Sequence, residues 1–437
     1  MTSVTEEFRP ARTPAPGPDA ARLGRAGGKV VFAIADQALI AGSNFLLNVL
    51  LARLLSTEGY GAFALAFSIF LLVANSYQAI LLTPSLVLAV TVFATRRAGY
   101  LAALLRFHVV VSVVVAAGFG GAAAVCTAFP GTVGFAPALA GLAISTPCVL
   151  LLWLVRSVYY IDMAPRQAAL GAFGYCCFLT ALLFLGRSYI STFTAFLATG
   201  GASLVVALLL LTRLPRHPAT AQDAVPFAEL WRESWEFGRW ELATSLVIWV
   251  TSGLCYPLTA AALGATYAGA LRGLQNFSLP FTHAFVACLR LAVPYASRQY
   301  ETEGRGVAAR LVYALLGVAI VVSLAYMGLI VALGTLPTDL LYGGKFGEFV
   351  SLIPLVLLGA LLGSSIEAVG VGLRATRNHR GLFLAYLAAA LPYLLLGYPA
   401  AVAFGLTGVI AGLAAANGVA LVTALVLFQR PAPEARS

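Results

Sequence analysis

Residues 32–82 read FAIADQALIAGSNFLLNVLLARLLSTEGYGAFALAFSIFLLVANSYQAILL, and this stretch decides the fold. It holds two apolar runs, 32–55 and 62–82, joined by a short polar turn and followed by Pro84, where we expect the second run to end. Each run has about 20 residues, enough at a rise of about 1.5 Å per residue to cross a hydrocarbon core about 30 Å thick. We therefore predict a transmembrane helical hairpin rather than part of a soluble core.

Few polar side chains interrupt these two runs, and their spacing follows the helical period. They are Asp36, Asn44 and Asn48 in the first run and Ser68, Asn75 and Gln78 in the second. Side chains three, four, seven or eight positions apart lie on one face of a helix. Each helix is therefore expected to present one hydrated or protein-facing stripe on an otherwise lipid-compatible surface.

The same stretch resembles a known family of transporters. The segments that carry the likeness are DQAL (36–39), GSNFL (42–46), LLARLL (50–55) and YGAFALA (60–66). They resemble the first helical hairpin of Wzx-type polysaccharide flippases, which belong to the multidrug/oligosaccharidyl-lipid/polysaccharide exporter (MOP) superfamily. The turn departs from the family pattern, because Leu55-Ser56-Thr57 stands where Leu-Gly-Pro is usual. The resemblance implies an all-α, two-lobed membrane transporter that handles lipid-linked sugars.

The composition independently indicates a polytopic membrane protein. Hydrophobic residues make up 60% of the chain and charged residues only 10%, and the mean hydropathy is +0.91. A soluble domain of this length does not have such a composition. The six cysteines fall inside apolar runs without metal-ligand spacing, so we predict no metal site. Lysine occurs only as Lys29 and Lys345 among many arginines, a bias typical of a GC-rich bacterial genome.

We predict about twelve membrane-spanning helices between two terminal tails. The spans are 30–54, 61–83, 106–128, 136–158, 168–185, 190–211, 240–262, 266–290, 310–333, 350–373, 381–399 and 403–428. Residues 1–28 are rich in Pro, Ala, Gly and Arg, which predicts a disordered tail, and 429–437 form a second tail. Basic residues concentrate on the side of the N-terminus, so both tails are expected in the cytoplasm and the protein in a bacterial inner membrane.

The longest connection, 212–239, divides the chain into two halves. Its first part holds three prolines and reads as a linker, and its last part predicts an amphipathic helix on the membrane surface. The N-lobe would then span 29–211 and the C-lobe 240–428, with six helices each. Because both lobes start on the same side, they would be parallel repeats around a central cavity, as alternating access requires.

Charged side chains inside the spans mark the candidate sites, since a charge at a helix centre costs about 2.5–3.5 kcal/mol on insertion scales. In the eighth span Arg272, Asn276 and His283 share one face, and Gln275 borders it. Glu241 in the seventh span and Glu367 in the tenth add carboxylates, and Glu367 is in line with Ser364 and Arg374 on one helical face. The cavity is therefore expected to contain both cations and carboxylates.

A cationic cavity suits a diphosphate-linked sugar, because guanidinium groups bind phosphate oxygens in a bidentate way. We expect Arg272 and Arg53 to contact phosphate. The amides expected to contact sugar are Asn44, Asn48, Asn75, Gln78, Gln275 and Asn276. Structural alternatives stay open: Arg53 can extend to the interface, Arg272 can pair with Glu241 or Glu367, and amides can join helices.

An energy source is not evident from a nucleotide-binding motif. Residues 343–345 read GGK but lack the rest of the GxxxxGK[ST] pattern, so neither ATP hydrolysis nor a cofactor is predicted. Coupling to H⁺ or Na⁺ could use Asp36, Glu241, Glu367 or His283, whose charges can change in a low-dielectric cavity. Asp36 and His283 could equally serve helix packing.

Taken with the resemblance, these features predict a flippase, not an enzyme, that moves an undecaprenyl-diphosphate-linked oligosaccharide repeat unit to the outer leaflet. The expected partners are that lipid-linked oligosaccharide, membrane lipids, and a polysaccharide polymerase and glycosyltransferases; no nucleic-acid partner is expected. The alternatives are a MATE-like drug/cation antiporter and a polysaccharide polymerase or ligase. Such enzymes use a long extracytoplasmic loop, whereas the longest one predicted here, 334–349, holds no histidine.

Overall fold

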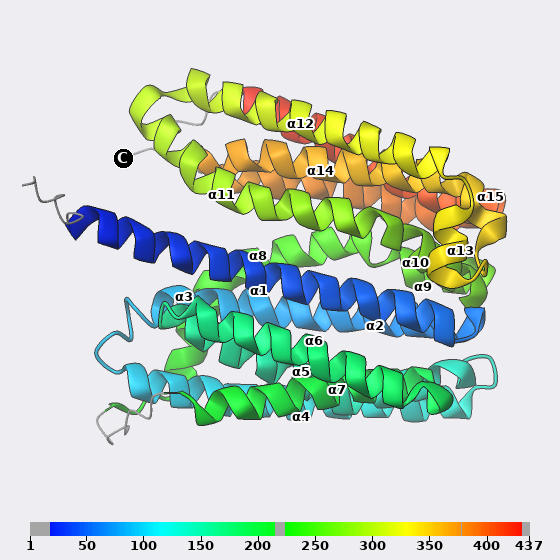
Figure 1. Ribbon diagram of the computed structural model, residues 1–437, viewed down its shortest axis with the longest axis horizontal. Coiled ribbons are helices and arrows are strands. Elements are labelled where there is room, and N and C mark those ends of the chain that lie inside the picture. Colours follow the sequence, from blue (N-terminus) through cyan, green and yellow to red (C-terminus); the bar gives the residue numbers. More distant parts are fainter. Residues whose placement is uncertain (1–17, 215–222, 377, 431–437) are drawn as a thin grey trace, which may run out of the picture.

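The computed structural model describes residues 18–214, 223–376 and 378–430, and every regular element in these ranges is helical. Ten helices of the described residues are long and apolar enough to cross a membrane. The long helices run side by side along the longest axis of the molecule (Figure 1). The prediction of an all-α, multi-pass membrane protein is therefore confirmed.

The first half of the chain forms one helical bundle. Its helices are α1 (Pro18–Leu54), α2 (Thr57–Tyr77), the π-helix η1 (Gln78–Leu82), α3 (Thr83–Leu88), α4 (Arg97–Ala128), η2 (Val133–Phe135), α5 (Ala136–Ile161), α6 (Pro165–Leu185), η3 (Arg187–Tyr189) and α7 (Thr192–Thr212). The most extensive packing in this bundle is of α5 on α7 and α4, and of α1 on α6. Stacked rings of Phe63, Phe67 and Phe196 fill part of its core.

The second half forms a second bundle beside the first (Figure 1). Its helices are α8 (Phe227–Ser252), α9 (Cys255–Leu263), α10 (Ala265–Gln275), η5 (Asn276–Ser278), α11 (Leu279–Glu303), α12 (Arg305–Ala332), α13 (Leu336–Tyr342), η6 (Gly347–Leu352), α14 (Ile353–Ala375) and α15 (His379–Gln429). Here α14 packs most closely on α15 and α12. The two bundles meet chiefly where α2 lies against α10.

The last helix, α15, supplies two of the predicted spans. Its backbone leaves the helical region at Gly405, with φ 60° and ψ −146°. Beyond this kink the chain runs back, since a Cβ on Gly412 would lie 3.4 Å from the ring of Tyr393, whereas a straight helix would separate them by about 28 Å. The more polar segment 265–303 supplies the eighth predicted span. All twelve predicted spans thus coincide with helices in the described part of the chain.

Two expected boundaries of the first hairpin are wrong. The second helix begins at Thr57 because Ser56 caps it, its Oγ accepting the Gly59 N–H at 3.0 Å. Pro84 does not end it, since the chain stays helical to Leu88. The π-helical turn before Pro84 widens the backbone and so accommodates a residue that lacks an N–H.

The expected terminal and linker segments also need correction. Helix α1 begins at Pro18, so 18–28 are helical, while 1–17 and the prolines at 215 and 218 lie outside the described residues. The stretch 227–239 is not a separate surface helix, because it is continuous with the rest of α8.

The first turns of α8 attach to the first bundle. Rings of Phe227 and Trp231 stack on Phe107 of α4 at 5.3 and 5.8 Å. Arg96 pairs with Glu229 at 2.5 Å. From Phe227 onward, the connection is therefore part of one long helix that packs on both bundles.

Candidate functional site

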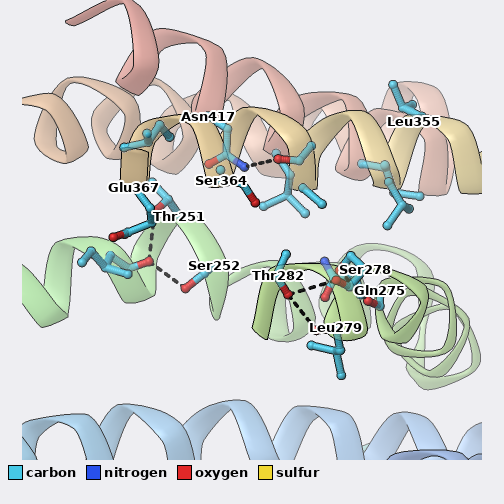
Figure 2. Close-up of a pocket in the computed structure, with 18 of the residues that line it drawn as sticks. Thr251, Ser252, Gln275, Ser278, Leu279, Thr282, Leu355, Ser364, Glu367 and Asn417 are labelled. Carbon is cyan, nitrogen blue, oxygen red and sulfur yellow. Dashed lines mark hydrogen bonds between the residues drawn. The ribbon is translucent and has the colours of Figure 1, made fainter. Parts of the chain in front are cut away.

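A cavity of about 340 Å³ lies in the second bundle, between α8, the α10–α11 segment, α14 and α15. Figure 2 shows its polar side chains approaching from facing helices. They are Thr251, Ser252, Arg272, Gln275, Asn276, Ser278, Thr282, Ser364, Glu367, Tyr386 and Asn417. All residues that line this cavity belong to the second half, and a cavity shared by both lobes stays a prediction.

The labelled polar residues of the cavity spread along its length. Glu367 faces Thr251 at one end, and Gln275 and Leu355 lie toward the other end on facing helices (Figure 2). Along α14 the step from Leu355 to Glu367 corresponds to about 18 Å. Glu367 accepts a hydrogen bond from the Tyr386 hydroxyl at 2.9 Å and pairs with Arg374 at 3.3 Å.

Apart from Arg272 and Glu367, the polar side chains that line the cavity are neutral hydrogen-bonding groups. The Thr251 and Ser252 hydroxyls both donate to the Ile248 carbonyl, at 2.9 and 2.8 Å. The Asn417 amide donates to the Gly359 carbonyl at 3.0 Å. Because each hydroxyl donates its only hydrogen to a carbonyl of its own helix, its oxygen can still accept a hydrogen bond from a ligand. The wall therefore suits a ligand rich in hydroxyl groups.

Arg272 lies where the cavity meets the first bundle. Its Nε donates to Asn48 of α1 at 2.8 Å and its Nη1 to the Tyr256 hydroxyl at 2.9 Å. The guanidinium also lies over the Phe67 ring of α2, 5.0 Å from its centroid. In the described part of the chain these partners are all neutral, and the alternative of an ion pair with Glu241 or Glu367 is wrong.

The backbone around Arg272 explains this placement. Gly264, whose φ of 99° favours glycine, separates α9 from α10. The chain turns there, so that Tyr256 on α9 comes to face Arg272 on α10. The Tyr256 hydroxyl in turn donates to Gln275.

Other predicted amides join the same network. Asn276 donates to the Tyr60 hydroxyl at 2.9 Å, while its buried Oδ1 has no described partner. Asn48 donates to the Asn44 carbonyl at 2.7 Å. Arg272, Asn48, Gln275 and Asn276 are therefore brought together, whereas Asn44 takes part through its backbone.

The remaining predicted residues lie away from this cavity. Asp36 is fully buried in the first bundle, where Arg156 donates to both its oxygens at 2.7 and 2.6 Å and Tyr160 donates at 2.6 Å. The other residues that do not line the cavity are Arg53, Asn75, Gln78, Glu241 and His283. Of these, Asn75 is half-buried and the other four are exposed.

Several lining residues were not found from the sequence. Thr251, Ser278 and Thr282 bond their own helices, as hydroxyls in apolar helices commonly do, so their sequence positions carry no distinctive signal. Asn417 did carry one, because it is an isolated amide in an apolar span. Tyr60 lies inside the family-like stretch, but only the fold brings it to Asn276.

Comparison with known proteins finds similar folds but no similar sequences. No protein-family model matches the sequence, and no curated protein matches it at a significant level. Solved structures do match over nearly the whole chain. An inward-facing multidrug resistance MATE family transporter of the MOP superfamily is 13% identical, with 90% of this chain and 93% of that chain covered and a TM-score of 0.76.

The chain has the fold of MOP-superfamily transporters. The lipid II flippase MurJ, in an inward closed conformation, is 14% identical over 91% of this chain and 87% of its own, with a TM-score of 0.69. An outward-facing MATE family transporter of the MOP superfamily is 14% identical over 92% and 94%, with a TM-score of 0.59. The two-lobed architecture implied by the sequence resemblance is therefore confirmed.

Proposed function

We propose that the protein is a flippase that moves an undecaprenyl-diphosphate-linked oligosaccharide repeat unit across the bacterial inner membrane by alternating access. One observation carries the proposal: Arg272 lines the cavity without an ion-pair partner among the described residues, because the one carboxylate of the wall, Glu367, is bonded to Arg374 and Tyr386 instead. Such a guanidinium can bind phosphate oxygens through charge-assisted hydrogen bonds. The lipid II flippase MurJ has the same fold, which supports a lipid-linked cargo.

The cavity's size restricts which part of the cargo it can hold. Its volume of about 340 Å³ lies at the low end for small-molecule sites. It therefore accommodates part of the head group, next to Arg272, rather than a whole repeat unit. In this proposal the remaining sugars occupy the space between the lobes, and the lipid tail stays among the membrane lipids.

An antiporter for cationic drugs is the second candidate, because the matched MATE transporters are described as multidrug resistance proteins. A cationic ligand needs a free carboxylate. The one carboxylate that lines the cavity, Glu367, is already bonded to Arg374 and Tyr386. The wall therefore favours an anionic, hydroxylated cargo over a cation.

Glu367 has a separate role in this proposal. It faces Thr251 across the cavity (Figure 2), and carboxylate and hydroxyl oxygens together suit H⁺ or Na⁺. The contact of Glu367 with Arg374 is longer and more exposed than that of the enclosed Asp36 with Arg156, at 3.3 Å against 2.6 Å. A small ion can share such a carboxylate, whereas a bulky drug cation would have to displace Arg374, so we assign Glu367, rather than Asp36, to ion coupling. In this proposal glycosyltransferases would act on the cargo before translocation and a polysaccharide polymerase after it. The chain itself would perform no chemical step.

The test is mass analysis of lipid-linked glycans in cells depleted of the protein, combined with an assay of the leaflet that holds them. A flippase predicts that a diphosphate-linked oligosaccharide accumulates in the cytoplasmic leaflet. Single repeat units in the outer leaflet would instead indicate a polymerase or ligase. If no glycan accumulates, the antiporter becomes the better explanation.

A further inference from the structure

The loop between α13 and α14 joins the two bundles at the end of the molecule where α1 stops. Lys345 in this loop donates its Nζ hydrogens to the carbonyls of Ala52, Arg53 and Leu55, at 3.3, 2.7 and 2.7 Å. Carbonyls at the end of a helix lack partners within the helix and carry its negative dipole end. A single lysine of the second bundle therefore caps the first helix of the first bundle.

The loop holds this lysine in a defined position. Gly343 and Gly344 have φ values of 65° and 80°, which favour glycine, and they set the loop's direction. The next residue, Phe346, is buried and packs its ring against Tyr60 at 6.1 Å and Tyr342 at 5.3 Å. Partial burial lowers the pKa of Lys345. The GGK segment thus acts as a helix cap and not as a phosphate loop.

A close helix contact continues from this cap toward the cavity. On α2, a Cβ at Gly61 would lie 1.7 Å from the Ala265 carbonyl oxygen of α10, so the two backbones touch. Farther along α10, the bonds from Arg272 to Asn48 and from Asn276 to Tyr60 cross the same boundary. We call this boundary, from Lys345 to Arg272, the seam.

The seam differs from the other connection between the bundles. A second connection is helix α8, which is continuous, packs along η1, α2 and α3, and stacks its first aromatic rings on α4. The seam instead consists of the α2–α10 contact, the packing of Phe346 on Tyr60 and a few polar bonds, and it can separate without breaking a helix. The charge distribution predicts that the seam lies at the extracytoplasmic end.

We propose that Lys345 and Arg272 are positioning residues that hold the seam shut. We further propose that an anionic group bound in the cavity draws Arg272 away from Asn48 and Tyr256. The proposal rests on the proposed function, since it assigns an outer gate to the transport cycle. Arg272 reaches both the seam and the cavity. A phosphate carries a full negative charge and can accept two parallel hydrogen bonds from one guanidinium, so it competes effectively with the neutral acceptors Asn48 and Tyr256.

The backbone comparison supports a shut seam. The TM-score is 0.76 with the inward-facing MATE transporter and 0.59 with the outward-facing one. A closed outer end is what an inward-facing arrangement requires. On release, the two bundles would part at the seam while α8 kept them joined.

The first test measures the distance across the seam directly. Spin labels are placed at Glu58→Cys of α2 and Leu340→Cys of α13, both exposed, in a chain whose six native cysteines have been replaced. Pulsed electron paramagnetic resonance on the full-length protein in nanodiscs then gives the populations of short and long distances. We expect Lys345→Met to raise the ratio of long to short distances about tenfold, the loss of one charge-assisted contact.

Two variants control this measurement. Lys345→Arg keeps the cation and should keep the short distance. Arg187→Met removes a cation whose described contact, the Phe184 ring at 5.0 Å, lies within the first bundle, and it should change nothing. If Lys345→Met and Lys345→Gln both leave the distances as in Arg187→Met, Lys345 does not hold the seam.

The second test asks whether an anion opens the seam by displacing Arg272 from Asn48. A short-chain isoprenyl diphosphate added to the labelled parent chain should raise the long-distance population, and Arg272→Met should abolish this response. Inorganic pyrophosphate is added at the same concentration for comparison. A response to the isoprenyl diphosphate alone indicates a lipid-linked diphosphate, and an equal response to both indicates the phosphate groups themselves. An equal response in Arg272→Met overturns the release step. If neither diphosphate has an effect but Lys345→Met opens the seam, Lys345 does hold the seam shut, and the proposed anionic cargo is contradicted.

Discussion

Two arginines inside the membrane-spanning helices have opposite environments. Arg156 of α5 is buried in the first bundle and donates to both oxygens of the fully buried Asp36. Arg272 of α10 is only half-buried, contacts neutral groups and crosses from one bundle to the other. The first has a permanent anionic partner, whereas the second has none among the described residues. Only Arg272 has its charge available for a ligand.

The comparison separates two reasons for placing a charge in a membrane helix. Asp36 and Arg156, together with Tyr160, form a closed set of hydrogen bonds between α1 and α5. Such a set fixes one arrangement of two helices. Arg272 is held by weaker neutral partners, so a competing anion can take it over. The first site is therefore expected to govern stability and the second to govern transport.

The largest effect is expected from breaking the Asp36–Arg156 pair. Asp36→Leu would leave the Arg156 guanidinium buried without its anion, and removing one partner of a buried pair costs about 3–5 kcal/mol. We expect the detergent-solubilised protein to lose monodispersity at a much lower temperature, measured by size-exclusion chromatography after heating. The double variant Asp36→Leu, Arg156→Leu should recover part of the loss. A stable single variant that has lost transport would instead return Asp36 to ion coupling.

The next largest effect concerns transport rather than stability. Arg272→Ala removes the unpaired cation of the cavity, and we expect polymer export to fall at least about tenfold, the loss of one charged contact. The amount of protein in the membrane should stay the same. Arg187→Ala, at an exposed basic position outside the cavity, is the matched control. Normal export by Arg272→Ala would remove this residue from the cargo site.

These two arginines also show how far the sequence could be interpreted. The spans, their number and the first hairpin followed from hydrophobic runs, because a bilayer sets the length of a helix that crosses it. Asp36 was singled out as a buried charge, but its partner Arg156 is 120 positions away, and no local pattern indicates such a contact. Arg272 was found because its helical face carries other polar residues.

The expected helix end at Pro84 was wrong for a similar reason: structure outside the local pattern decided the outcome. Pro84 is a strong helix breaker by local rules, but the π-helical turn at 78–82 directly before it lets the helix continue. The cavity's position could not be predicted because Asn417 and Thr251 reach it only when α15 and α8 pack around it. Sequence periodicity gives the face of a helix, and packing decides what that face meets.

The comparison can be sharpened by making Arg272 resemble Arg156. Asn48 accepts from Arg272 at 2.8 Å, so Asn48→Asp would give the guanidinium a carboxylate partner in nearly the same place. We expect the seam to become more stable and export to fall several-fold, because cargo must then displace an anion. Thermal stability and export are measured on the same variant. Asn48→Gln, which stays neutral, is the control, and a rise in export in Asn48→Asp would contradict the competition argument.

The smallest effect is expected from loosening Arg272 without removing it. Tyr256→Phe takes away the hydroxyl that accepts from Arg272 Nη1 at 2.9 Å and leaves the ring that packs beside it. A hydrogen bond of this kind contributes about 0.5–1.5 kcal/mol. We expect a slight loss of thermal stability, with the long-distance population across the seam raised a few-fold. Tyr159→Phe loses a hydroxyl that bonds the Leu210 carbonyl within the first bundle, so it should lower stability to a similar extent and leave the seam unchanged. Equal seam distances in the two variants would show that Arg272 acts on the seam without Tyr256.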